Sequence, residues 1–119
     1  HPVNLMVAKQ MVEKSWPHAQ VNTIHSGQAA LAFIQQNEVD MVLMDMFMPE
    51  MDGMEVTRAI RLLPSPQNKI PVLGLTASSN AADHAQCMAA GMNGLVFKPL
   101  ESHELEKGVN LCMTSKGQS

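Results

Sequence analysis

The segment Val39–Gly53 reads VDMVLMDMFMPEMDG, and it joins two kinds of local structure. Its first half is apolar at every position up to Met44 except Asp40. Such a run is typical of a strand that is covered on both faces, as in a parallel sheet. The run stops at Asp45, and the proline, aspartate and glycine within residues 48–53 indicate a turn. The segment therefore predicts a buried strand that ends in a carboxylate at the start of a loop.

Three other stretches have the composition of strands. Two are short apolar runs like the first: Ile70–Leu75, which ends at Thr76, and Gly94–Phe97, which ends at Lys98. The third alternates along Ala19–Thr23 and predicts a strand as well. The sequence thus predicts four strands, three of which are buried and end in a polar side chain.

Helical patterns separate these strands. Ser26 and Ser79 are candidate N-caps, and Gly91 stands where a left-handed helix terminator is expected. Pro17 and Pro64 end two of the apolar patterns. The predicted helices are Asn4–Lys14, Gly27–Ile34, Met54–Leu63, Asn80–Ala90 and Ser102–Met113.

The alternation of helices and strands defines the fold class. Repeated crossovers from strand to helix to strand imply an α/β fold, in which a parallel sheet carries helices on both faces. The 119 residues, 45% of them hydrophobic, suffice for one domain and leave no room for a second. Ligands of such sheets bind beyond the carboxyl ends of the strands.

Composition excludes several classes of function. The chain has 8 basic and 11 acidic residues, a net charge of −3, and only three Phe, one Trp and no Tyr, which argues against binding nucleic acid. The two cysteines, Cys87 and Cys112, are too few for a disulfide scaffold and predict reduced thiols in the cytoplasm. No apolar run approaches the roughly 20 residues of a membrane span, so membrane contact is not expected.

The polar ends of the three buried strands suggest one chemistry. A carboxylate, a hydroxyl and an ammonium from Asp45, Thr76 and Lys98 would converge at one edge of a parallel sheet. This set suits phosphoryl transfer, with Asp45 as the nucleophile and the other two side chains binding phosphoryl oxygens. A Mg²⁺ ion would offset the charge, with Asp45 and the backbone carbonyl of Phe47 among its oxygen ligands.

At these residues the chain resembles response-regulator receiver domains. The loop of residues 45–53, Leu75-Thr76-Ala77 and Phe97-Lys98-Pro99 are similar to the three signatures of that family and lie in the same order. The resemblance implies a flavodoxin-like, three-layer α/β/α fold with strand order 2-1-3-4-5. It also implies transfer of a phosphoryl group to Asp45 from a phosphohistidine on a histidine kinase core or a histidine phosphotransfer domain. Residues 1–113 would form the receiver domain, followed by a polar tail at 114–119.

Three further segments of the sequence narrow the resemblance to one group of receiver domains. Residues 4–8, 70–77 and 87–93 look like receivers fused to hybrid sensor histidine kinases. The domain would then be the C-terminal part of a hybrid kinase in a phosphorelay, cytoplasmic even where the parent protein is anchored in the inner membrane. It would assist its own phosphoryl transfer without turning over a small substrate, and the parent chain would be the transferase.

The N-terminus departs from the family pattern. Receivers begin with an apolar strand that ends in two acidic residues, which supply the rest of the metal site, whereas this sequence starts at His1-Pro2-Val3-Asn4. The expectation is a receiver truncated at its N-terminus, with an incomplete Mg²⁺ site, weak Mg²⁺ binding and poor phosphorylation. Because that strand is central in the family, its absence would leave two unpaired strand edges and favour a homodimer or a strand-swapped oligomer.

A second departure lies three residues before Lys98, where the family often has an aromatic switch residue and this chain has Leu95. Because leucine has no ring, coupling of Thr76 to a rotating aromatic side chain at that position is not expected. Movement of the loop around Ala77 and of the helix after it remains open as a route for the signal.

Two alternatives stay open from the sequence. One is a receiver-like interaction module that has lost phosphorylation, which the sequence upstream of His1 would decide. The other is a flavin-binding protein of similar fold, which would need a phosphate loop and stacking aromatics that are not visible. A zinc site at His84 and Cys87 lacks a second pair of ligands.

Overall fold

The computed structural model describes residues 2–22, 24, 26–45, 53–77, 80–97 and 100–118. Helices and strands alternate from β1 onward, with a short 3₁₀ helix between α3 and β2. In chain order the elements are α1 (Pro2–Ser15), α2 (Gly27–Gln36), β1 (Val42–Asp45), α3 (Gly53–Arg61), η1 (Gln67–Lys69), β2 (Val72–Thr76), α4 (Ala81–Ala90), β3 (Gly94–Phe97) and α5 (Ser102–Gln118).

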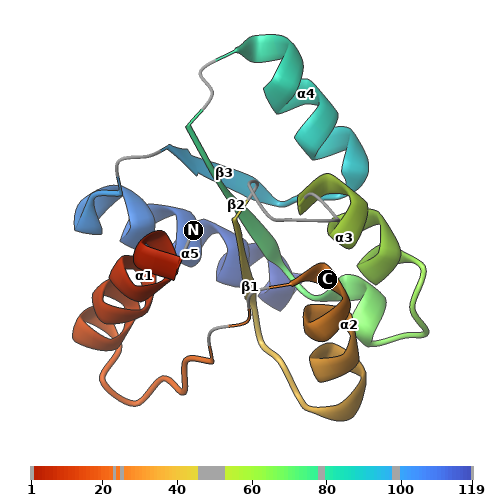
Figure 1. The fold of residues 1–119 in the computed structure, drawn as a ribbon, viewed down its shortest axis with the longest axis horizontal. Helices are drawn as coiled ribbons and strands as arrows, with labels where there is room; N and C mark the ends of the chain where they lie inside the picture. Colours follow the sequence, from red (N-terminus) through yellow and green to blue (C-terminus); the bar gives the residue numbers. More distant parts are fainter. Residues whose placement is uncertain are drawn as a thin grey trace.

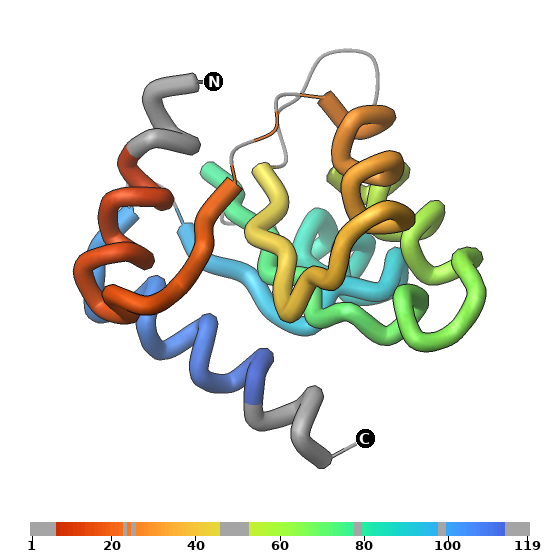
Figure 2. The backbone as a smooth tube through the Cα atoms, turned by 90° about the horizontal axis from the view of Figure 1, so that it is seen from below, coloured from red at the N-terminus to blue at the C-terminus, as the bar shows by residue number. Residues whose placement is uncertain are grey.

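The described strands form one parallel sheet in the order β1-β2-β3. Helices α1 and α5 cover one face of this sheet, and α2, α3 and α4 cover the other (Figures 1 and 2). The expected three layers are therefore present. Parallel neighbours also explain why the strands are apolar throughout, because both faces of β2 are covered and all five of its residues are buried.

Each face of the sheet has its own apolar core. The first core joins the sheet to α2, α3 and α4, and its buried members are Ile34, Met44, Val56, Ile60, Ile70, Val72, Cys87 and Met92. The second core joins the sheet to α1 and α5, and its buried members are Ala8, Leu73, Leu75, Val96, Leu105 and Cys112. Members of the two cores alternate along the strands, as the two-residue period of a strand requires.

Capping residues begin and end the helices on the α2–α4 face. The Ser26 hydroxyl accepts a hydrogen bond from the backbone N–H of Ala29 and caps α2, as predicted. Gly91 ends α4 with φ +113°, also as predicted. The N-cap of α4 was predicted at Ser79, which lies outside the described residues. The structure places the cap at Asn80, whose side chain accepts from the N–H groups of Ala82 and Asp83.

The predicted strand at Ala19–Thr23 is wrong for the residues that the structure describes. Ala19 and Gln20 are exposed, and residues 19–22 are not part of any strand. A strand is defined by pairing with a neighbour, and within the described part of the chain β1 pairs only with β2. The alternating pattern alone could not supply that neighbour.

The largest differences from the predicted boundaries are at the end of α5 and at the start of β1. Helix α5 was expected to end at Met113, but its backbone continues to Gln118, so most of the predicted polar tail is helical. The tail contains no proline, and extending an existing helix needs no new nucleation. β1 starts at Val42 and not at Val39. Among the described helices, none has the length and apolarity required to cross a membrane.

Gly108 in α5 lets that helix lie close to the sheet. A Cβ atom at this position would stand 2.9 Å from Cγ2 of Val96 and 3.1 Å from Cδ2 of Leu73. Both neighbours are buried in the second core and have little room to move. The glycine is unfavourable for the helix by about 1 kcal/mol relative to alanine, and the close packing explains why it is tolerated.

We expect Gly108→Ala to lower the free energy of unfolding by about 1 kcal/mol. Overpacking of a core costs about 1–3 kcal/mol, which outweighs the roughly 1 kcal/mol gained in helix propensity. Urea denaturation followed by circular dichroism would measure the change. The matched control is Asn110→Ala, at an exposed position of the same helix, and a Gly108→Ala protein as stable as that control would contradict the packing argument.

Candidate functional site

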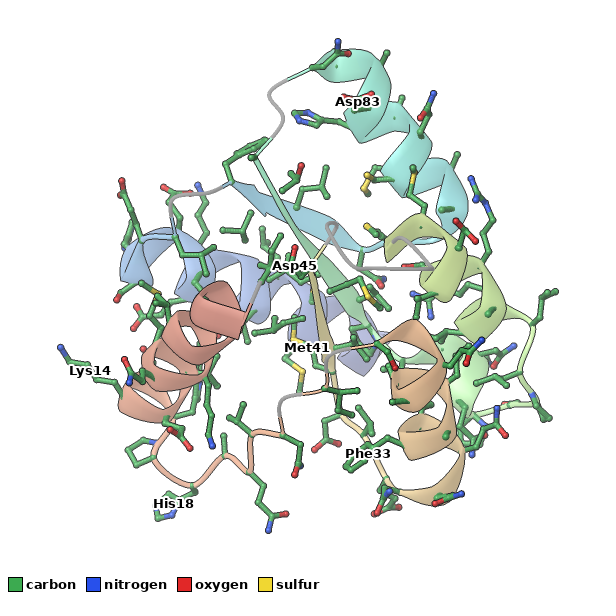
Figure 3. All side chains as sticks on the ribbon, viewed as in Figure 1. Lys14, His18, Phe33, Met41, Asp45 and Asp83 are labelled. Atoms are coloured by element: carbon green, nitrogen blue, oxygen red, sulfur yellow. The ribbon has the colours of Figure 1, made fainter. Side chains whose placement is uncertain are left out.

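The candidate site lies at the carboxyl ends of the parallel strands. Asp45 is the last residue of β1, and Thr76 is the last residue of β2. The register pairs Asp45 with Leu75, so Thr76 lies one residue further along the neighbouring strand. Figure 3 shows Asp45 at the upper end of β1, near the middle of the molecule. The structure therefore brings two of the predicted site residues to the same edge of the sheet.

Asp45 is buried to a degree that is unusual for a carboxylate, with 2% of its surface exposed. Its Oδ2 atom is buried and accepts no hydrogen bond, although the residue takes part in other interactions. Oxygen atoms of this kind require an explanation, and one explanation is a function that involves an ion or a reacting group. Thr76 is also buried, with 8% of its surface exposed.

Lys98 and Phe47, the other two predicted site residues, lie outside the described residues. Phe97, the residue before Lys98 in the sequence, ends β3 and pairs in register with Thr76. The helix that follows the loop after Asp45 is held at its start, where the buried Thr57 hydroxyl donates to the carbonyl oxygen of Gly53 at 2.7 Å. That anchor was not predicted from the sequence.

The described residues offer few ligands for a metal ion. Among them, no group of three or more His, Cys, Asp and Glu side chains is placed to hold a metal. Mg²⁺ is bound by oxygen ligands in an octahedral set that commonly includes several waters and only one or two carboxylates. The buried Oδ2 of Asp45 is suited to one such position. Among the described residues, Asp45 therefore fits one ligand position of a Mg²⁺ ion.

Leu95, which stands at the family's aromatic switch position, packs against the first core. Phe97, two residues further along β3, is instead 47% exposed, and its ring lies 4.9 Å from the ring of His84 on α4, measured between centroids. No sequence pattern relates these two residues, which are 13 positions apart. Cys87, considered with His84 for zinc, is buried in the first core.

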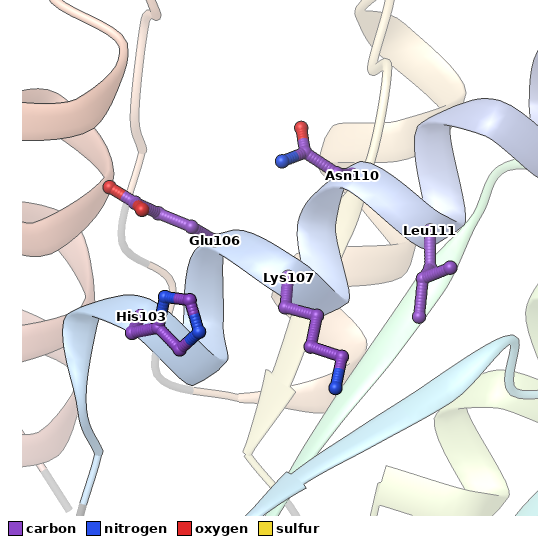
Figure 4. Close-up of a pocket in the computed structure, with 5 residues that line it drawn as sticks. All are labelled: His103, Glu106, Lys107, Asn110 and Leu111. Carbon is purple, nitrogen blue, oxygen red and sulfur yellow. The ribbon is translucent and has the colours of Figure 1, made fainter.

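A shallow hollow lies elsewhere, on the outer face of α5. It is lined by His103, Glu106, Lys107, Asn110 and Leu111, all from that one helix (Figure 4). Glu106 also accepts a hydrogen bond from the Ser15 hydroxyl at the end of α1. None of the lining residues comes from a strand end, so the hollow is separate from the site at Asp45.

Comparisons with known proteins agree on one family. Residues 1–110 match the model of the response regulator receiver domain. The chain is 33% identical over 111 residues to the sensor protein GacS of Pseudomonas syringae pv. syringae, which covers 92% of this chain. It is 36% identical over 127 residues to histidine kinase 2 of Arabidopsis thaliana, which covers 90% of it. The chain spans only 12% and 11% of the length of these two relatives.

Solved structures confirm the fold. The receiver domain of sensor histidine kinase PA1611 of Pseudomonas aeruginosa, described with magnesium coordinated in its active site cleft, superposes with a TM-score of 0.83 at 29% identity over 96% of this chain and 91% of that one. The receiver domain of a signal transduction histidine kinase of Syntrophus aciditrophicus gives a TM-score of 0.85 at 24% identity, over 100% and 88% of the two chains.

These matches favour a receiver domain over a flavin-binding protein of similar fold. The fold is the flavodoxin-like fold of receiver domains, and the relatives are histidine kinases that carry such a domain. The match to the family model covers all of the described strands and the polar residue at the end of each. The chain belongs to the family of response regulator receiver domains.

Proposed function

We propose that this receiver domain accepts a phosphoryl group from a phosphohistidine onto the carboxylate of Asp45. The observation that supports this assignment is the burial of a carboxylate at the carboxyl end of β1, where ligands of parallel sheets bind. A strand-terminating carboxylate with no function would be expected to reach solvent. The match to the receiver family over residues 1–110 includes this position.

The proposed transfer is a substitution at phosphorus. An Asp45 carboxylate oxygen attacks the phosphorus atom, a P–O bond forms, and the P–N bond to the histidine breaks. The histidine nitrogen keeps the bonding electron pair, and the product on this chain is an acyl phosphate. Hydrolysis by water later releases inorganic phosphate and restores the carboxylate.

Thr76 and Lys98 would stabilise the transferred group. The Thr76 hydroxyl donates a hydrogen bond to one phosphoryl oxygen, and the Lys98 ammonium pairs with another. Mg²⁺ would neutralise part of the charge that develops on the phosphoryl oxygens. Asp45 and the backbone carbonyl of Phe47 are its proposed ligands in this chain.

The proposed partner is a protein that carries the phosphohistidine, either a histidine kinase core or a histidine phosphotransfer domain. This proposal rests on the relatives, several of which are named as histidine kinases. The parent protein of this domain would be a hybrid kinase that acts in a phosphorelay, with the receiver in the cytoplasm. The domain itself assists a single transfer and turns over no small substrate.

Phosphoryl labelling tests the assignment directly. The chain is incubated with acetyl phosphate or a phosphorylated histidine phosphotransfer domain and Mg²⁺, and then treated with hydroxylamine, which converts an acyl phosphate to a hydroxamate. We expect mass spectrometry to locate the hydroxamate on Asp45. A hydroxamate on another carboxylate, or a label that resists hydroxylamine, would refute the assignment.

We further propose that the Mg²⁺ site within residues 1–119 is incomplete. The acidic pair that receivers place after their first strand has no counterpart in these residues. Extending the chain at its N-terminus by an apolar strand that ends in two acidic residues should tighten Mg²⁺ binding at least about tenfold, since even the loss of an outer partner of a metal ligand costs that much. Labelling should accelerate in parallel.

Calorimetry with Mg²⁺ and the rate of labelling measure this prediction. The matched control carries the same added strand with two asparagines in place of the acids, so it restores the sheet but not the charge. Equal Mg²⁺ affinity with the acids, with the asparagines and without the strand would show that the site is already complete.

The outer edge of β1 supports a further expectation about assembly. The Val42 N–H donates to the Pro71 carbonyl oxygen at 2.9 Å, so the N–H and carbonyl of Leu43 point away from β2. Within the described part of the chain no strand pairs with that edge. An exposed edge promotes pairing with another copy, so we propose a homodimer or a strand-swapped oligomer.

Light scattering after size exclusion measures the assembly. We expect a mass of at least twice the 13.0 kDa of one chain at high protein concentration. A single-chain mass at every concentration would contradict the proposal.

A further inference from the structure

Phe97 connects the candidate site to the surface of the domain. It ends β3 directly before Lys98, and the register pairs it with Thr76 at the end of β2. Its side chain is 47% exposed, although it is the only aromatic side chain of the described strands. A large apolar ring at this position calls for a reason beyond filling the core.

Thr76 and Phe97 point to the same face of the sheet. Along β2, Leu73 and Leu75 belong to the core beneath α1 and α5, so Thr76 faces the side of α3 and α4. Along β3, Val96 belongs to that same core beneath α1 and α5, so Phe97 likewise faces the side of α4. Residues that pair in register on neighbouring strands and share a face are side-chain neighbours.

His84 completes the connection from the other side. It lies in the first half of α4, and its ring and the ring of Phe97 have centroids 4.9 Å apart with a 44° angle between the planes. Aromatic pairs at such separations interact favourably and depend on geometry. Phe97 therefore lies between the site residue Thr76 and the helix that follows it in the chain.

We propose that the ring pair of His84 and Phe97 couples Thr76 to the position of α4. A change at the Thr76 hydroxyl, such as its binding to a phosphoryl oxygen, would move the neighbouring Phe97 ring and with it the His84 side of α4. Leu95 has no ring and is packed in the first core, so it does not offer this route. The regulatory role of this coupling rests on the proposed function of the site.

The coupling is tested first without phosphorylation. Thr76→Val replaces the hydroxyl by a methyl group of similar size, and backbone amide spectra of the ¹⁵N-labelled protein report on α4. We expect amide signals of Ala81–Ala90 to move by more than a linewidth in Thr76→Val. The same substitution made in a Phe97→Leu or a His84→Gln background should leave these signals in place.

Phe33→Leu is the matched control, because it makes the same chemical change on α2, away from α4. Thr76→Val in the Phe33→Leu background should still move the α4 signals. Unmoved α4 signals in Thr76→Val alone, or an equal movement with and without the Phe97 ring, would overturn the coupling.

A second arm separates this inference from the proposed function. Acetyl phosphate and Mg²⁺ are added to the N-terminally extended protein, and the label on Asp45 and the α4 signals are measured in one sample. Label without movement of the α4 signals overturns the coupling and leaves the phosphoacceptor assignment standing. Absence of label counts against the phosphoacceptor assignment, and the Thr76→Val series then decides the coupling by itself.

Discussion

Replacement of Asp45 by asparagine is expected to reduce phosphoryl label on the chain at least about 100-fold, to the background of the assay. The substitution keeps the size of the side chain but removes the oxygen nucleophile that forms the acyl phosphate. No other carboxylate is expected to replace it, because Asp45 is the only buried carboxylate among the described residues. Labelling with phosphorylated histidine donor, followed by gel electrophoresis, measures the effect.

Asp40→Asn is the matched control for this experiment. Asp40 lies five residues earlier on the approach to β1 and is exposed, so the substitution removes the same charge without touching the strand end. We expect the control to label at the rate of the original chain. Label that persists in Asp45→Asn, or is lost equally in Asp40→Asn, would mean that the phosphoacceptor has been placed wrongly.

The burial of Asp45 also predicts a structural side effect of that substitution. Burial of a charged carboxylate is costly in the folded state because it removes the group from water, and an uncharged amide at the same place is less costly to bury. Asp45→Asn should therefore be no less stable than the original chain. Loss of label cannot then be attributed to unfolding.

Much of the site followed from the sequence because buried parallel strands leave a clear signal. Runs of apolar residues that stop at Asp45, Thr76 and Lys98 predict both the strands and the edge where their ends meet. The structure places the first two at one edge of the sheet, since Asp45 pairs with Leu75 and Thr76 is the next residue of that neighbouring strand. The side chain of Lys98 lies outside the described residues.

Other features depend on neighbours that a sequence does not reveal. The alternation at Ala19–Thr23 is adequate for a strand, yet pairing decides whether a strand forms. The cap of α4 falls within the run Ser78-Ser79-Asn80, where all three residue types are good N-caps. Local preference therefore could not choose Asn80, and Gly108 likewise looked only unfavourable until α5 was seen against Val96.

Arg61 belongs to no motif of the sequence, yet its replacement is expected to cause the largest loss of stability. Its guanidinium donates five hydrogen bonds from the end of α3. The acceptors are the Gly91 carbonyl at 3.0 and 2.7 Å, the carbonyls of Asn68 at 3.0 Å and Ile70 at 2.7 Å, and Oδ1 of Asn93 at 2.9 Å. These acceptors lie 7 to 32 residues away in sequence, so no local motif points to them.

The Arg61 bonds hold together three connections of the fold. They reach the segment before β2, the terminus of α4 and the turn before β3. Asn93 extends the network, because its Oδ1 also accepts from the Val72 N–H at 2.8 Å. Burial lowers the pKa of the Arg61 guanidinium from its usual value, but arginine stays protonated at neutral pH, so all five donors remain available.

Arg61→Met should therefore lower the free energy of unfolding by about 3 kcal/mol. A methionine keeps much of the apolar stem but leaves the acceptors without their donor, and each unsatisfied buried acceptor costs about 1–3 kcal/mol. The estimate is less than the sum over all acceptors because Arg61 is only half-buried and water can reach some of them. Chemical denaturation, with the slope checked for two-state behaviour, measures the loss.

Arg58→Met is the matched control for Arg61→Met. Arg58 lies one turn earlier on α3 and its side chain is exposed. We expect Arg58→Met to change the free energy of unfolding by no more than about 0.5 kcal/mol. The network binds the residues that precede β2 and β3, at the edge of the sheet opposite to Asp45 and Thr76. Folded Arg61→Met protein should for that reason accept label on Asp45 at an unchanged rate. Equal stability of the two variants would refute the stabilising role of the Arg61 hydrogen bonds. Slower labelling of folded Arg61→Met protein would show that the two edges of the sheet are coupled.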